Sequence, residues 1–192
     1  MKIILTIFIL LFSSSVLAED ITEFEIEGMS IGDSLLDYFS ETEIKSFRSY
    51  SYDDNKFYSI DIINSSLIFK IYNGVQVQIK TNDRKYILHG ISGALFYEDN
   101  EFNICMKKLK EIKSDIKNIF TTYSEEEYDH SHPNDNNSNA YSYFMTNKEG
   151  EISLQCIEWS KKYANEKNLY HNLRVSVFTN DFSYWISNIA YQ

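Results

Sequence analysis

RKYILHGISGALFYE (residues 84–98) and EFNICMKKLKEIKSDIKNIF (residues 101–120) are the two neighbouring stretches that decide the fold of this chain. The first is long and rich in β-branched and aromatic residues, as strands are. The second carries apolar residues at steps of four, three, four and three, the spacing of one stripe on an α-helix: Cys105, Leu109, Ile112, Ile116 and Ile119. Because a helix with one apolar stripe must cover another element, we predict that it packs on an antiparallel sheet.

Further strand-like segments lie on both sides of this pair. Before it come FYSIDII (57–63), SLIFKIY (66–72) and VQVQIK (75–80). Asn73–Gly74 is a hairpin signal between the last two, because both residues accept positive φ. After the pair come YSYFMT (141–146), EISLQCIEW (151–159), LRVSVF (173–178) and YWISNIAY (184–191). NKEG and TNDF would supply hairpin turns, and KKYANEKNLYHN (161–172) a longer connection that holds a helical turn.

The N-terminal part adds one strand and two short helices to this plan. ITEFEIEG (21–28) alternates as a half-buried strand does, and the pairs Ser30 with Asp33 and Ser40 with Glu43 are capping-box-like helix starts. The apolar residues of these helices are Ile31, Leu35, Leu36, Phe39, Ile44 and Phe47. We therefore expect an α+β fold in one domain, residues 19–192. A helix followed by four strands occurs twice, which divides the domain into halves 19–97 and 98–192.

The first eighteen residues, MKIILTIFILLFSSSVLA, have the pattern of a secretory signal peptide. A lysine precedes an apolar run that is too short to span a bilayer, and small residues then precede a cleavage site before Glu19. We therefore predict a periplasmic or secreted protein with no stable membrane insertion. The net charge of −10 repels nucleic acid, which excludes it as a partner.

Two resemblances fit this plan. The repeated order of a helix and four strands resembles the two-repeat architecture of the β-lactamase-inhibitor proteins and the helix-on-sheet domains of outer-membrane assembly lipoproteins. The opening FEIEGMSIGDSLLDYFSETEI (24–44) resembles the start of a group of small, uncharacterised exported bacterial proteins, with a weaker echo in ILHGISGALFYE (87–98) and the cysteine after it. The second resemblance implies no function.

Cys105 and Cys156 are the only cysteines. Cys105 lies on the apolar stripe of the long helix, and Cys156 shares a strand face with Ile152 and Leu154. Both thiols therefore point to the interface between helix and sheet, and export places them where disulfides persist. We predict a Cys105–Cys156 disulfide. Neither cysteine has a CxxC partner or a neighbouring histidine, so we assign no catalytic role to them.

SEEEYDHSHPNDNNSN (124–139) is the most polar stretch of the chain. Its weak candidates for a divalent metal site are Asp129, His130, His132 and Asp135, which offer two imidazoles and two carboxylates. The segment has turn and loop composition, however, and nothing apolar to orient these ligands. We therefore favour a solvated, mobile loop without a metal.

Other residues receive structural interpretations. Gly90 and Gly93 indicate a bulge or bend in their strand, and a core or hydrogen-bonded position is expected for His89. The lysines of the long helix, at 107, 108, 110, 113 and 117, mark its solvent face. Alternation places Tyr141 and Tyr143 on one strand face, and Tyr184, Ile186 and Asn188 on another. The sheet would therefore present either an open aromatic face or two buried faces.

Two classes of function remain open. We favour an exported, non-catalytic module that uses its open sheet face to bind an unknown protein or small-molecule partner, without a cofactor. The alternative is a hydrolase-type envelope enzyme whose site is assembled from scattered residues such as His89, Glu158 and His171. No pair of titratable residues has a spacing that catalysis demands, so no catalytic residue is assigned.

Overall fold

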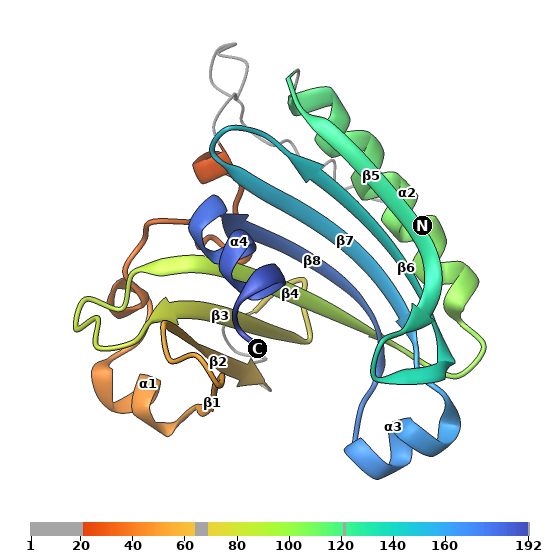
Figure 1. Cartoon of the computed structure of the whole chain (residues 1–192), viewed down its shortest axis with the longest axis horizontal. Helices are drawn as coiled ribbons and strands as arrows, with labels where there is room; N and C mark the ends of the chain where they lie inside the picture. The colour runs from red at the N-terminus through yellow and green to blue at the C-terminus, as the bar shows by residue number, and fades with distance from the viewer. Residues whose placement is uncertain (1–20, 64–68, 121, 192) are drawn as a thin grey trace, which may run out of the picture.

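The computed structural model describes residues 21–63, 69–120 and 122–191 (Figure 1). Its strands are β1 (Arg48–Ser51), β2 (Phe57–Ile63), β3 (Gly74–Lys80), β4 (Leu88–Tyr97), β5 (Ser124–His132), β6 (Asp135–Thr146), β7 (Gly150–Glu158) and β8 (His171–Thr179). Its helices are η1 (Ile21–Glu23), η2 (Leu35–Asp37), α1 (Glu41–Ser46), α2 (Phe102–Ile119), α3 (Lys161–Lys167) and α4 (Asn180–Asn188). The predicted signal peptide and its cleavage site lie outside the described residues.

All eight strands form one antiparallel sheet in the order β1-β2-β3-β4-β8-β7-β6-β5. Each run of four consecutive strands is a meander, and the two meanders join where β4 pairs with β8, from Gly90↔Phe178 to Tyr97↔His171. The α+β fold predicted from the sequence is confirmed. A helix precedes each meander, and the division into halves 19–97 and 98–192 stays a prediction.

The main core lies between α2 and the sheet. Cys105, Leu109 and Ile116 of α2 are buried in one apolar cluster with Leu154 of β7 and Leu173 of β8. Each such aliphatic side chain contributes about 1.5–3 kcal/mol when it is fully buried. The predicted apolar stripe therefore packs against the sheet, and it determines which face of the sheet α2 covers.

The segment 184–191 is helical, so the strand predicted there is wrong. Thr179 caps α4, because its Oγ1 accepts a hydrogen bond from the Phe182 amide at 3.2 Å. Phe182 and Trp185 are buried against Phe57 in a second, smaller core, with ring centroids 5.2 and 5.0 Å from that of Phe57. The helical step from Phe182 to Trp185 outweighs the alternation seen in YWISNIAY. TNDF is thus a helix start and not a hairpin turn.

This second core lies on the sheet face opposite α2, so helices cover part of both faces. Figure 1 shows α2 behind the sheet and α4 in front of it. Phe178 of β8, which packs against the second core, alternates with Val177, which belongs to the main core. Since successive residues of a strand point to opposite faces, α4 lies on the face that bears Phe178, opposite α2.

The segment 124–139 forms β5, a turn and the start of β6, so the loop predicted there is wrong. The two strands pair from Ser124↔Thr146 to His132↔Asp135. An edge strand exposes one edge and much of both faces to water, and it tolerates a charged sequence that a central strand does not. Two of its acidic residues also have partners on α2. Lys113 Nζ lies 2.6 Å from Glu127 Oε2, and Lys117 Nζ lies 2.8 Å from Glu125 Oε2.

The predicted strand at 21–28 is also wrong. The chain turns back at Glu27 and Gly28, whose φ angles are 55° and 80°, and only an isolated bridge joins Ile26 to Met29. The Glu27 carboxylate then accepts hydrogen bonds from the backbone amides of three residues, Lys70, Ile71 and Tyr72, at 2.7–2.9 Å. Burial is the largest single influence and would raise the pKa of Glu27, but the three hydrogen bonds together outweigh it and lower the pKa.

Those amides are therefore not in a strand ladder, and the strand predicted at 66–72 is not formed by its described residues, 69–72. Residues 64–68 lie outside the description. Neither Asn73 nor Gly74 has positive φ, and β2 pairs directly with β3 at Ile63↔Gly74, so the predicted Asn-Gly hairpin turn is wrong. The first meander still has four strands, because β1 takes the place of the strand predicted at 66–72. The sequence did not predict β1.

Local signals were more reliable at the start of α1 and at the glycines of β4, whereas no helix begins at Ser30, because the N-cap of η2 is Ser34. Ser40 and Glu43 form the predicted capping box of α1. The register of β3 and β4 shifts between Gln78 and Ile79, next to His89 and Gly90, which is the irregularity that the glycines indicated. A Cβ at Gly90 would lie 2.4 Å from Gln78 Oε1 and 2.7 Å from Phe178 Cδ1, so both side chains would have to shift to admit a larger residue.

Candidate functional site

The sheet face opposite α2 has a floor of small polar side chains. Ser92, Ser176 and Ser153 lie side by side on β4, β8 and β7, since Ser92 pairs with Ser176 and Ser176 with Ser153. Each alternates with apolar residues of the main core. We call this surface the polar face and define it by the following residues: Asp61, Gln76, Ser92, Ser142, Ser153, Gln155, Asn172, Arg174 and Ser176.

Arg174 lies in the middle of the polar face, on the central strand β8. It is opposite Ala94 of β4 and Gln155 of β7 in the register of the sheet. The side chain is half-buried, and within the described parts of the chain it makes no hydrogen bond or ion pair. Burial lowers the pKa of the Arg174 guanidinium, while the charge of Asp61 acts in the opposite direction.

The polar groups around Arg174 bond to one another and not to it. Gln78 Nε2 donates to Gln76 Oε1 at 3.1 Å, and Gln76 Nε2 donates to Asp61 Oδ1 at 2.7 Å. On the other side, Gln155 Nε2 donates to the Ser142 hydroxyl at 3.2 Å. Asp61, the acidic residue whose charge acts on Arg174, is thus already engaged by an amide.

Two other residues of β8 also have a polar atom without a hydrogen-bond partner among the described residues. The Ser176 hydroxyl is buried, with 1% of the residue exposed, and has no hydrogen-bond partner among the described residues. The Oδ1 atom of Asn172 is likewise buried and without a partner there, whereas its Nδ2 donates to the Tyr170 carbonyl at 2.9 Å. Asn172, Arg174 and Ser176 are alternate residues of one strand, so they point to the same face. We call these three residues the β8 row.

Aromatic side chains border the polar face. Tyr128 of β5 is 50% exposed and contacts the ring of Phe144 of β6, with centroids 6.2 Å apart. At the other border, the exposed Tyr191 contacts Tyr52 at 5.7 Å.

The residues predicted to form an aromatic face of the sheet do not lie together on one sheet face. Tyr141 and Tyr143 point to the α2 side, where their hydroxyls donate to Glu127 and Glu125 at 2.6 and 2.9 Å. Tyr184, Ile186 and Asn188 belong to α4.

The predicted pairing of Cys105 and Cys156 is present. Their sulfurs lie 1.98 Å apart and their Cα atoms 6.0 Å apart, so a disulfide joins α2 to β7. Both residues are buried on the α2 side of the sheet. This bond holds the fold and takes no part in the polar face.

The scattered residues considered for catalysis are only partly brought together. Glu158 and His171 line a small cavity of about 170 Å³ with Asp99. His171 Nδ1 accepts a hydrogen bond from the Trp159 amide at 3.0 Å, and its Nε2 lies 2.9 Å from Asp99 Oδ1. Both nitrogens are thus occupied, which leaves no lone pair for proton abstraction.

His89 is not part of this cavity. Its ring packs against Phe57, with centroids 5.3 Å apart, on the side of the sheet where α4 lies. Burial lowers the pKa of His89, and the charge of Lys80 acts in the same direction. His89 is thus half-buried beside the second core, and its Nδ1 atom has no hydrogen-bond partner among the described residues, so the expected core or hydrogen-bonded position is met only in part.

The four weak metal-ligand candidates do not converge. Asp135 accepts hydrogen bonds from the hydroxyls of Ser138 and Ser160, and His132 packs on Trp159 with centroids 4.4 Å apart. His130 is bonded to Ser142, and Asp129 points to the opposite face of β5. No group of three or more ligating side chains suited to a metal occurs within the described ranges.

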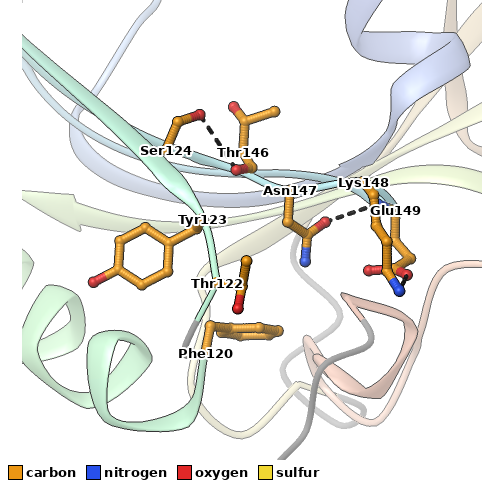
Figure 2. Close-up of a pocket in the computed structure, with 8 residues that line it drawn as sticks. All are labelled: Phe120, Thr122, Tyr123, Ser124, Thr146, Asn147, Lys148 and Glu149. Carbon is orange, nitrogen blue, oxygen red and sulfur yellow. Dashed lines mark hydrogen bonds and ion pairs between the residues drawn. The ribbon is translucent and has the colours of Figure 1, made fainter.

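A larger cavity, of about 390 Å³, lies where α2 ends and β5 begins, next to the turn between β6 and β7 (Figure 2). Asn147 holds that turn, because its Oδ1 accepts hydrogen bonds from the amides of Glu149 and Gly150 at 2.9 and 3.0 Å. One Glu149 oxygen lies 3.2 Å from Lys148 Nζ. The other Glu149 oxygen, Oε2, is buried and has no hydrogen-bond partner among the described residues.

The fold and the polar face define a class: an α+β protein with one long helix on one side of an eight-stranded antiparallel sheet and a largely buried layer of polar side chains on the other. No family model, curated protein or solved structure matches the chain. In the part of the chain that the structure describes, no helix is long and apolar enough to cross a membrane.

Proposed function

We propose that this protein is an exported, non-catalytic binding protein that holds a partner protein against its polar face. The observation that carries the proposal is the β8 row, in which the Arg174 guanidinium, the Asn172 Oδ1 atom and the Ser176 hydroxyl lack hydrogen-bond partners among the described residues although they lie on a central strand. Buried polar groups are almost always hydrogen-bonded. The missing bonds therefore favour a surface that is completed by another molecule.

The residue types of this surface also favour a protein partner. Tyrosine, phenylalanine and arginine are enriched at protein interfaces, and Tyr128, Phe144 and Arg174 lie on the same sheet face. The serines between them are buried, with 1–3% of each residue exposed, so contact with a partner would fall to the longer side chains. Export is supported by the signal-like N-terminus and by the disulfide.

The catalytic alternative receives less support. Its strongest pair, His171 and Asp99, has the hydrogen bond of a general base, but the Trp159 amide blocks the nitrogen that would accept a proton. Glu158 accepts a hydrogen bond from Asn139 at 3.0 Å. We therefore retain the binding function as the one conclusion.

The test compares partner capture by three forms of the protein from an envelope extract. Tyr128→Ala removes an exposed aromatic ring from the polar face, and Ile104→Ala removes an exposed apolar side chain from α2 on the opposite side. Proteins bound by the wild type and by Ile104→Ala should be lost with Tyr128→Ala. Capture that is unchanged by Tyr128→Ala would show that the partner does not bind at the polar face.

A further inference from the structure

The β8 row has a chemical character that narrows the class of partner, on the assumption that the proposed binding function holds. Arg174 offers a planar fork of N–H donors, and the Ser176 hydroxyl offers one more on the same side of the strand. Asn172 contributes an acceptor, its Oδ1 atom. The donors therefore outnumber the acceptors, and the only formal charge in the row is positive.

Nothing in the described chain neutralises that charge. Asp61 is the acidic residue whose field acts on Arg174, but the side-chain amide of Gln76 already donates to it at 2.7 Å. Arg174 does not form an ion pair with it within 4.0 Å. A half-buried guanidinium without an acceptor loses hydration and regains nothing, whereas a carboxylate would meet its fork with two parallel hydrogen bonds.

The spacing of the row suits an extended chain. Alternate residues of a strand lie about 6.6–6.8 Å apart, which is also the repeat of an extended peptide. An acidic side chain on Arg174 would therefore leave backbone groups of the same peptide near Asn172 and Ser176. The Asn172 Oδ1 and Ser176 Oγ atoms are themselves buried, so Arg174 is the group of the row that reaches the peptide.

The net charge of the protein sets a further condition. At −10, it repels a strongly acidic partner at long range. We propose that the β8 row binds an extended peptide segment of a partner protein through one acidic side chain, whose carboxylate pairs with Arg174, within a segment that is otherwise neutral or basic.

The experiment uses two minimal probes that differ only in charge, N-acetyl-aspartate N-methylamide and its asparagine counterpart. Each is titrated into the isotope-labelled protein at constant ionic strength, and the Arg174 Nε–H signal and the β8 amide signals are followed by NMR. The aspartate probe should cause a saturable shift at Arg174 and bind at least about tenfold more tightly than the asparagine probe, because hydrogen bonds to a charged group are worth about 1.5–3 kcal/mol.

Variants identify the group responsible. Arg174→Gln should reduce the preference for aspartate to about one, whereas Arg48→Gln should leave it intact, because the Arg48 guanidinium lies over the Tyr50 ring at 4.6 Å on the edge strand. Arg174→Lys keeps the charge but not the fork, and it should retain the preference with weaker binding. It also provides the comparison if Arg174→Gln does not fold.

Equal binding of the two probes, no saturable shift at Arg174, or a preference that persists in Arg174→Gln would overturn the inference. Its failure is distinct from failure of the proposed function. Partner capture that depends on Tyr128 but is unchanged by Arg174→Gln would retain the polar face and reject the carboxylate. Capture that is insensitive to Tyr128→Ala would reject the polar face itself.

Discussion

At the scale of single residues, Glu151 shows how the second helix changes the chemistry of a strand. It lies on the same face as Phe178, and α4 covers it, so that its carboxylate accepts a hydrogen bond from Ser183 at 2.8 Å. Burial nevertheless raises its pKa, because desolvation outweighs that hydrogen bond. The charged form of Glu151 is therefore disfavoured in the folded state.

The consequence is a pH-dependent cost. A carboxyl whose folded pKa is raised contributes its stability below the unfolded value of about 4.3, and that contribution is lost as the pH rises through the folded pKa. We therefore predict that Glu151→Gln increases the melting temperature at pH 7 but not at pH 4. Thermal unfolding at both values checks this, with Glu98→Gln, at the exposed residue that follows β4, as the control. An equal effect at both pH values would contradict the prediction.

At the scale of elements, β5 is attached to α2 by two similar sets of three residues. Glu127 accepts hydrogen bonds from Lys113 and Tyr141, and Glu125 does so from Lys117 and Tyr143. These contacts lower the pKa of both glutamates, chiefly through the lysines. The hydrogen bond to Glu127 and burial raise the pKa of Tyr141 to about 12.

The attachment of β5 should weaken in acid. A carboxyl whose folded pKa is lowered contributes stability above its unfolded value of about 4.3, and this is lost as the pH falls through the folded pKa. Hydrogen exchange of the β5 amides should therefore speed up between about pH 5 and pH 3, relative to the core strands. In the double variant Glu125→Gln, Glu127→Gln, this acid effect should be absent. Glu126→Gln, on the other face of β5, should retain it.

The disulfide is a second connection between elements, because it joins α2 to β7. It closes a loop with a sequence separation of 51, for which the chain-entropy account gives a stabilisation on the order of 4 kcal/mol. Cys105→Ala and Cys156→Ala should lower the melting temperature by similar amounts, and the double variant should be no less stable than either one. Labelling of the unreduced, denatured protein should find no free thiol. Two reactive thiols per chain would contradict the bond.

The elements also show which sequence signals were sufficient. The stripe of α2 and the Ser40–Glu43 capping box are local patterns, and both were predicted correctly. YWISNIAY and the segment 124–139 were misassigned because their state depends on neighbours. The helix α4 gains its stability from Phe57, far earlier in the chain, and β5 gains its own from lysines of α2.

At the scale of the whole molecule, the polar face could not be predicted from its strands alone. The alternation in HNLRVSVF places Asn172, Arg174 and Ser176 on one face. Whether that face is covered depends on where α4 ends, and whether Arg174 has a partner depends on β2 and β7. These are long-range facts that only the assembled sheet supplies. The cysteine pair was predictable because both residues lie on strongly apolar faces.

Export is a prediction about the whole chain. The lysine, the short apolar run and the small residues before Glu19 predict that the exported form begins at this residue. N-terminal sequencing of the protein from its native envelope should yield Glu-Asp-Ile-Thr. An intact Met1 in that fraction would contradict cleavage.

The central claim, that Arg174 serves a partner and not the fold, is tested most directly by equilibrium unfolding in urea at pH 7. Arg174→Met keeps the length of the side chain and removes its unpaired charge. The free energy of unfolding should rise by on the order of 1 kcal/mol, since replacing a poorly compensated charge by an apolar side chain is often stabilising. Arg48→Met, the control, should show no such gain. A loss of stability in Arg174→Met would show that the fold itself needs this guanidinium, and would contradict the account.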